Sequence, residues 1–234
     1  MNIRVGTSGY NYPEWKGTFY PGDLAAAKML PYYAARFPTV EINATFYRMP
    51  TPKTVVGWAA ATPEGFVLAL KAPQRITHFA RLRNVDDPLR FFCDAARTLG
   101  PKLGPLLFQL PPNFKKDTDR LAETLFQLPP DLRCAWEFRH ESWLADDVYD
   151  LLRRRNAALC IADSEAASTP LVATADFGYL RLRDEGYTED DLARWAETIR
   201  GLGTRWREAF VYFKHEESGT GPAFAARLGR LLAA

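Results

Sequence analysis

Charged side chains recur near the C-terminal ends of several apolar segments of this sequence. Glu41, Glu137 and Asp163 are the candidate catalytic carboxylates. A charge inside a strand costs free energy unless it is paired or solvated, so several charges near the same end of neighbouring strands indicate a shared polar centre. Paired carboxylates in different surroundings can split their pKa values and serve as general acid and general base.

Cations and aromatic rings accompany these carboxylates. Arg and Lys side chains clamp phosphate or carboxylate groups, and Tyr and Trp rings can stack on a sugar or a base. The candidate ligand-binding residues are Tyr10, Trp15, Asn43, Lys71, His78, Gln109, Arg139, His140, Trp143, Arg181, Arg183 and Lys214. They predict an anionic ligand such as a phosphorylated sugar, a nucleotide or a nucleic-acid backbone. Two blander interpretations remain open: the charges pair with one another to hold the fold closed, and the aromatic rings are core or rim packing.

Familiar catalytic motifs are missing from the sequence. The histidines and carboxylates come from different segments, with no HExxH or similar spacing, so we assign no metal ligand; which cofactor the protein uses, if any, stays unknown. There is no Walker loop, dinucleotide fingerprint or GxSxG elbow, which disfavours kinase, Rossmann dehydrogenase and serine hydrolase functions.

Eight short apolar segments alternate with amphipathic ones, and each begins apolar and ends polar. Such runs are typical of parallel strands covered on both faces. The predicted strands are residues 3–9, 39–45, 66–73, 104–111, 133–139, 158–164, 178–183 and 209–215. We therefore predict an α/β fold, a single TIM-type (β/α)8 barrel formed by residues 1–234 as one domain, with a reduced or missing helix between strands six and seven. A doubly wound open sheet is the alternative.

Helical spacing and capping residues predict the intervening helices. Residues 24–37, 191–202 and 224–232 have apolar positions at helical spacing. Asp87 is the predicted N-cap before Pro88 at the first helical position, and Ser142 the predicted N-cap of the next charged helix. Alternation within the strands predicts that Glu41, Asn43 and Thr45 share one face, as do Glu137 and Arg139.

Composition points to an ordinary folded protein of the cytoplasm. Hydrophobic residues make up 47% of the 234 residues and charged residues 25%, and the formal net charge is +2. This near-balance of basic and acidic residues differs from the large positive charge of a strongly basic nucleic-acid-binding protein. No stretch approaches the roughly 20 apolar residues of a membrane helix, and no apolar signal segment follows Met1. Cys93, Cys134 and Cys160 lie in apolar surroundings without metal spacing, which favours buried free thiols in a reducing compartment.

Several long segments make the chain resemble the YecE-like family, known as domain of unknown function 72. They are GTSGYNYPEWKGTFYP, VEINATFYRMP, KAPQRITH, LGPLLFQLPPNF, EFRHESW and IADS, in family order and over nearly the whole chain. The resemblance implies an α/β barrel and no settled activity. The C-terminal third departs from the family: Arg183 and Asp184 stand where the family has His-Gly, and Lys214 and His215 where it has Asn-Asn. If the family's site uses those residues, this member differs in its ligand or has lost activity.

Three hypotheses about function follow. The first is a protein that binds a phosphorylated or other anionic ligand at the C-terminal mouth, as an enzyme of the hydrolase or isomerase class. The second is an endonuclease-like nucleic-acid-binding or -processing protein that uses the same cationic mouth. The third is a ligand sensor without catalysis. A metal-dependent nuclease or isomerase would be an analogy of fold alone.

Overall fold

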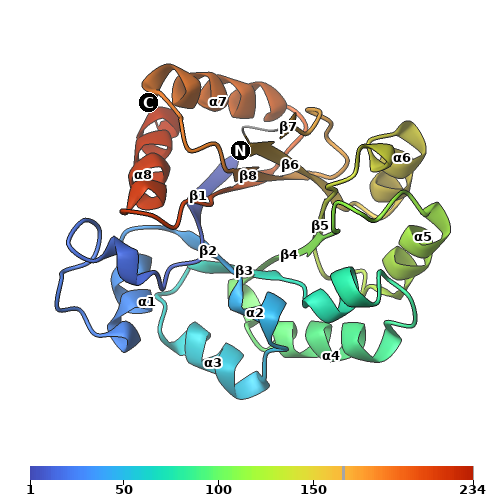
Figure 1. The fold of residues 1–234 in the computed structure, drawn as a ribbon, viewed down its shortest axis with the longest axis horizontal. Coiled ribbons are helices and arrows are strands. Elements are labelled where there is room, and N and C mark those ends of the chain that lie inside the picture. The colour runs from blue at the N-terminus through green and yellow to red at the C-terminus, as the bar shows by residue number, and fades with distance from the viewer. Residues whose placement is uncertain (165–166, 234) are drawn as a thin grey trace.

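The chain folds into a (β/α)8 barrel, as Figure 1 shows in a view down the molecule's shortest axis. A computed structural model describes residues 1–164 and 167–233. The strands are β1 (Asn2–Ser8), β2 (Thr39–Ile42), β3 (Val67–Lys71), β4 (Leu103–Gln109), β5 (Cys134–Glu137), β6 (Ala158–Ser164), β7 (Ala167–Ser168), β8 (Phe177–Leu182) and β9 (Glu208–Phe213). All except β7 pair in parallel, and β5–β6 and β1–β9 pairing completes the ring. All eight predicted strands and the predicted barrel are confirmed.

Helices surround the strands. They are α1 (Ala26–Ala34), α2 (Ala44–Tyr47), α3 (Pro52–Ala60), α4 (Asp86–Arg97), α5 (Thr118–Gln127), α6 (Asp146–Arg154), α7 (Glu189–Leu202) and α8 (Thr220–Ala233). A π-helical turn, η2 (Arg75–Phe79), follows β3. Between β6 and β8 the described residues contain the short antiparallel β7 and no helix, in line with the predicted reduced crossover. The described helices include none with the length and apolar character to cross a bilayer.

Two predicted caps are wrong, because local contacts replace them. Helix α4 begins at Asp86 after Val85, two residues before the predicted first helical residue Pro88. Ser142 lies inside a 3-10 turn, η4 (Glu141–Trp143), and its hydroxyl accepts from the Lys116 backbone N–H at 2.8 Å. Helix α6 consequently starts after Ala145 without a side-chain cap.

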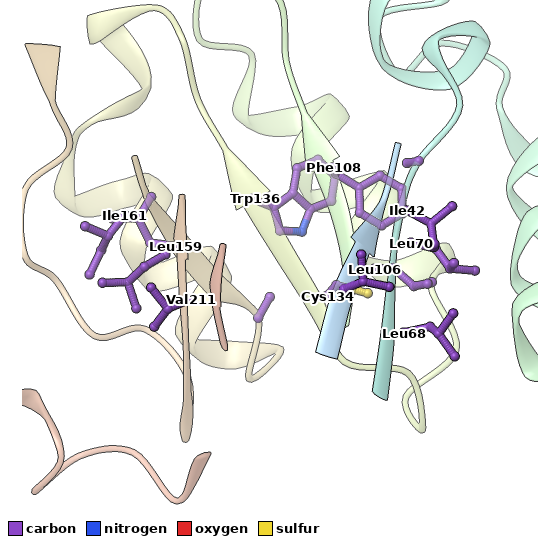
Figure 2. Close-up of a cluster of buried hydrophobic side chains, with 14 of the residues drawn as sticks. Ile42, Leu68, Leu70, Leu106, Phe108, Cys134, Trp136, Leu159, Ile161 and Val211 are labelled. Carbon is purple, nitrogen blue, oxygen red and sulfur yellow. The ribbon is translucent and has the colours of Figure 1, made fainter. Parts of the chain in front are cut away.

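Alternation along the strands separates two apolar layers. The layer between the strands and the helices includes Leu68, Leu70, Leu106, Phe108 and Trp136, and Figure 2 shows part of it. The residues between them along the same strands form the barrel interior, with Val67, Ala69, Leu107, Ala135, Cys160, Tyr179 and Tyr212. Because side chains alternate along a strand, Lys71, Gln109, Glu137 and Arg181 continue this inner layer toward the C-terminal ends of the strands. The fold therefore brings four predicted site residues together at the C-terminal end of the barrel, which we call the mouth.

Candidate functional site

A buried ion-pair network lies at the base of this mouth, centred on Arg181 of β8. One guanidinium nitrogen of Arg181 donates to Glu41 at 2.9 Å, and the other donates to Glu137 at 2.5 Å. All three residues are 0% exposed. Strands β2, β5 and β8 are thus tied together by charge at the centre of the barrel.

Hydrogen bonds complete the coordination of Glu41. The Tyr179 hydroxyl donates to its second carboxylate oxygen at 2.6 Å, and the Ser8 hydroxyl donates to the first. Ser8 in turn accepts from Arg181 at 3.0 Å and from the Asn43 amide at 2.8 Å. These donors fix the position of the Glu41 carboxylate.

The second carboxylate of the network, Glu137, is held ionised. Arg139 donates its Nε–H to the carboxylate oxygen that Arg181 leaves free. Burial by itself would raise the pKa of Glu137, but the Arg181 and Arg139 guanidiniums outweigh it and hold that pKa well below its usual range. Burial opposes the charge of Arg181 as well, yet Glu41 and Glu137 raise its pKa well above the usual value.

A second set of polar side chains lies at the same mouth and includes the buried residues Lys71 and Gln109. The Lys71 ammonium donates to the Gln109 side-chain oxygen at 2.9 Å and lies 4.1 Å from the centroid of the Phe46 ring. Burial, followed by the charge of Arg181, lowers the pKa of Lys71 to about 7. Among the described residues, no carboxylate lies within ion-pair distance of this lysine.

Arg183 lies half-buried at the same mouth. Burial lowers its pKa, and Arg139 lowers it further, so the two guanidiniums repel each other. The described part of the chain offers Arg183 no ion pair either. Lys214 is nearer to solvent and is 3.5 Å from a Glu216 carboxylate oxygen.

The histidines at this end have structural partners. The His78 ring accepts or donates at Thr77 Oγ1, 2.9 Å away, and packs edge-on against Phe46. Burial, then the charge of Lys71, lowers the pKa of His78 and favours its neutral form. His140 Nδ1 accepts from the Ser142 backbone N–H at 3.1 Å, and His215 Nε2 donates to the Asp184 carbonyl at 2.7 Å.

Some predicted site residues lie apart from the network. Asp163 accepts from the Tyr187 hydroxyl at 2.7 Å and from Ser168, so its carboxylate links β6 to β7 and to Tyr187. Trp15 and Trp143 are completely buried among other rings, and Tyr10 packs against the core. Strand β2 ends at Ile42, so the predicted strand alternation does not reach Thr45, which lies in α2. Asn43 precedes α2 and stays in contact with the network through Ser8.

The described residues contain no group of three or more His, Cys, Asp or Glu side chains placed to hold a metal ion. All three cysteines are free and buried, and burial raises the pKa of the Cys93 thiol to about 12. A thiol with such a raised pKa is a weak nucleophile near neutral pH.

Sequence reasoning missed Tyr179 and Phe46. Tyr179 precedes Arg181 by two residues, so strand alternation was a usable signal for its inward position. Phe46 follows the end of β2 in the four-residue helix α2, whose ring orientation no periodicity predicts.

Fold and site together define a (β/α)8-barrel protein with a polar C-terminal mouth. The family model described as "Protein of unknown function DUF72" matches residues 4–234, and the chain belongs to that family. A DUF72 family protein of Thermotoga maritima has the same fold, with a TM-score of 0.86 and 25% identity over 100% of both chains.

Two relatives agree with this membership. The UPF0759 protein YunF of Bacillus subtilis is 32% identical over 156 residues, which cover 63% of this chain and 54% of YunF. The UPF0759 protein YecE of Escherichia coli K12 is 32% identical over 112 residues, 48% of this chain and 39% of YecE. The matched segments thus span about half of these relatives or less.

Proposed function

We propose that the protein binds a phosphorylated or other anionic ligand at the C-terminal mouth of the barrel. The observation that carries this proposal is the pair of poorly solvated cations, Lys71 and Arg183, that have no carboxylate partner among the described residues. Removing a cation from water without a counter-ion costs free energy, and a bound anion would offset that cost. Sites that bind phosphate commonly use such cations.

An enzymatic use of the ligand is the second part of the proposal. A general acid or base works best when its pKa lies near the operating pH. Lys71, with a pKa of about 7, meets that condition. Glu137, with a lowered pKa, is a weak base, and its contacts support a positioning role toward Arg181 and Arg139. Glu41, Glu137 and Asp163 remain candidate catalytic residues, each to be tested by the amide variant once a substrate is known.

The binding experiment is isothermal titration calorimetry of the purified protein with sulfate, inorganic phosphate and ribose 5-phosphate at constant ionic strength. We expect saturable binding with one site per chain. Lys71→Met and Arg183→Met each remove one charge-assisted contact, worth about 1.5–3 kcal/mol, and should weaken binding about 10- to 100-fold.

The matched controls are Lys53→Met and Arg205→Met, which remove exposed cations elsewhere on the surface. They should leave the affinity unchanged. If none of the three anions binds saturably, or if the mouth variants behave like the controls, the proposal is wrong. Binding to duplex or single-stranded DNA that weakens steeply with salt would instead support the nucleic-acid alternative.

A further inference from the structure

A cavity lies beside the mouth, between α2, the turn η2 and helix α4, which Figure 1 shows next to one another. Its volume is about 670 Å³, within the usual range for small-molecule sites. Phe46, Tyr47, Phe79 and Phe91 contribute rings to its wall. We call it the aromatic pocket.

The rings of this pocket are unusually open to solvent. Tyr47 is 75% exposed, Phe79 74% and Phe91 51%. The part of the chain that the structure describes has only one other exposed aromatic side chain, Phe126 of α5. Clustered exposed aromatic rings mark binding sites, because each ring leaves a large apolar face in water until a ligand covers it.

The charges of the pocket largely cancel. Asp87 pairs with Arg90 at 2.7 Å, and Asp94 lies 3.5 Å from Arg97. Arg75 adds one cation to the wall. This pocket consequently suits an uncharged flat ring, which aromatic faces and a guanidinium plane can both stack against, rather than a second phosphate.

Phe46 joins the aromatic pocket to the mouth. Its ring lines the pocket, and the Lys71 ammonium lies 4.1 Å from the centroid of the same ring. Tyr47 packs edge-on against Phe46 with centroids 5.1 Å apart. One ligand can therefore extend from the cation to the aromatic wall if its anionic group and its flat ring are joined by a short linker.

The backbone beside the aromatic pocket has an energetically unfavourable conformation. The π-helical turn Arg75–Phe79 leads into Arg81 and Leu82, which have φ of 48° and 65°. Non-glycine residues with such φ values carry strain, and π-helical turns occur frequently at functional sites. The strained segment ends the turn that presents Phe79.

From these observations we infer that the aromatic pocket is the base-binding subsite of a mononucleotide whose phosphate binds at the mouth. This inference rests on the proposed anion site, and it narrows the ligand class: a nucleotide has both the flat ring and the phosphate, whereas a sugar phosphate has only the phosphate. Phe79 and Tyr47 supply stacking faces for the base, and Lys71 contacts the phosphate.

The test compares adenosine 5′-monophosphate with ribose 5-phosphate by isothermal titration calorimetry of the whole chain. Stacking of one base predicts that the nucleotide binds about 10-fold or more tightly than the sugar phosphate. Phe79→Ala and Tyr47→Ala should each remove most of that advantage and leave the affinity for ribose 5-phosphate unchanged. Phe126→Ala, an exposed phenylalanine on another helix, is the control and should change neither.

The outcomes separate this inference from the anion site. If ribose 5-phosphate binds in a Lys71-dependent way but the nucleotide binds no tighter, the base subsite is wrong and the anion site stands. If neither binds, both are wrong. Light scattering on the same variants tests whether this surface is instead a contact between two copies of the chain. A concentration-dependent dimer that Phe79→Ala abolishes, with the nucleotide affinity unchanged, would support such a contact and overturn the base subsite.

Discussion

Lys71 donates to Gln109 across two neighbouring strands, and this neutral oxygen is the acceptor where a buried lysine usually has a carboxylate. Lys71 meets Gln109 because β3 and β4 are adjacent in the barrel and place both side chains in the inner layer. An amide oxygen orients the amine without neutralising it. The charge of Lys71 is therefore not neutralised by this partner, and the pKa of about 7 that burial gives it underlies the first prediction.

Anion affinity should fall as the pH rises through about 7, the pKa of Lys71. Only the protonated amine attracts an anion, so loss of the proton weakens binding. The other groups that act on Lys71 are Arg181, Glu41, Glu137, Lys214 and the neighbouring His78. Between about pH 6 and about pH 8.5 we expect sulfate binding to weaken about tenfold, the equivalent of one charge-assisted hydrogen bond.

Sulfate is the right probe because it stays a dianion over that range. Lys71→Arg keeps its charge and should flatten the pH profile while it retains binding at the alkaline end. An unchanged slope in Lys71→Arg would show that another group controls the profile.

Arg181→Met should destabilise the protein strongly. The substitution leaves Glu41 and Glu137 buried without their shared partner, and breaking a buried ion pair in this way costs about 3–5 kcal/mol. Urea denaturation followed by circular dichroism measures the free energy of unfolding. Arg139→Met, which removes a partly exposed partner of Glu137, is expected to cost about 1 kcal/mol or less.

Adding Glu137→Gln to Arg181→Met tests the electrostatic origin of that loss. The double variant buries one uncompensated charge fewer, so it should be more stable than Arg181→Met alone. Equal stability of the two would mean that lost packing, and not charge, is responsible.

Gly6→Ala should also destabilise the fold, for a steric reason. A Cβ at position 6 would lie 2.2 Å from the Thr39 carbonyl oxygen of β2, so the two strands would have to separate. We expect a loss of about 1–3 kcal/mol, typical of overpacking. Gly57→Ala is the matched control: its Cβ would meet nothing within 4 Å in α3, and it should stabilise the protein by about 0.4–1 kcal/mol. Thermal unfolding of the two variants checks both signs.

The barrel was predictable because each strand carries its own signal. An apolar run that ends in a charged residue, such as the segment that ends at Lys71, indicates a strand that is buried on both faces and ends at a polar mouth. This pattern can be recognised from the local sequence alone. The boundaries were less certain. The strand alternation predicted through Thr45 ends at Ile42, because the chain turns into α2 at Ala44; Asn43 nevertheless contacts Ser8, the partner of Glu41.

The partners within the site were much harder to predict. The three charges of the Arg181 network lie on strands far apart in the sequence, and which cation meets which carboxylate depends on the curvature of the closed ring. Aromatic residues were ambiguous for another reason. Trp143 and Phe79 are both large apolar rings in loops after strands, and only tertiary packing decides that one is buried and the other is exposed.

The positions of Glu41, Glu137 and Arg181 along the chain have a consequence for biosynthesis. Both carboxylates leave the ribosome well before Arg181, so a nascent chain that ends before β8 has Arg139 for Glu137 but lacks the guanidinium that pairs with both Glu41 and Glu137. Burying unpaired carboxylates costs several kcal/mol each, which opposes closure of an incomplete ring. Strand β1, in turn, finds its second neighbour only when β9 has been made. A chain that stops before β8 therefore lacks both the counter-charge of Glu41 and the last strand that closes the ring.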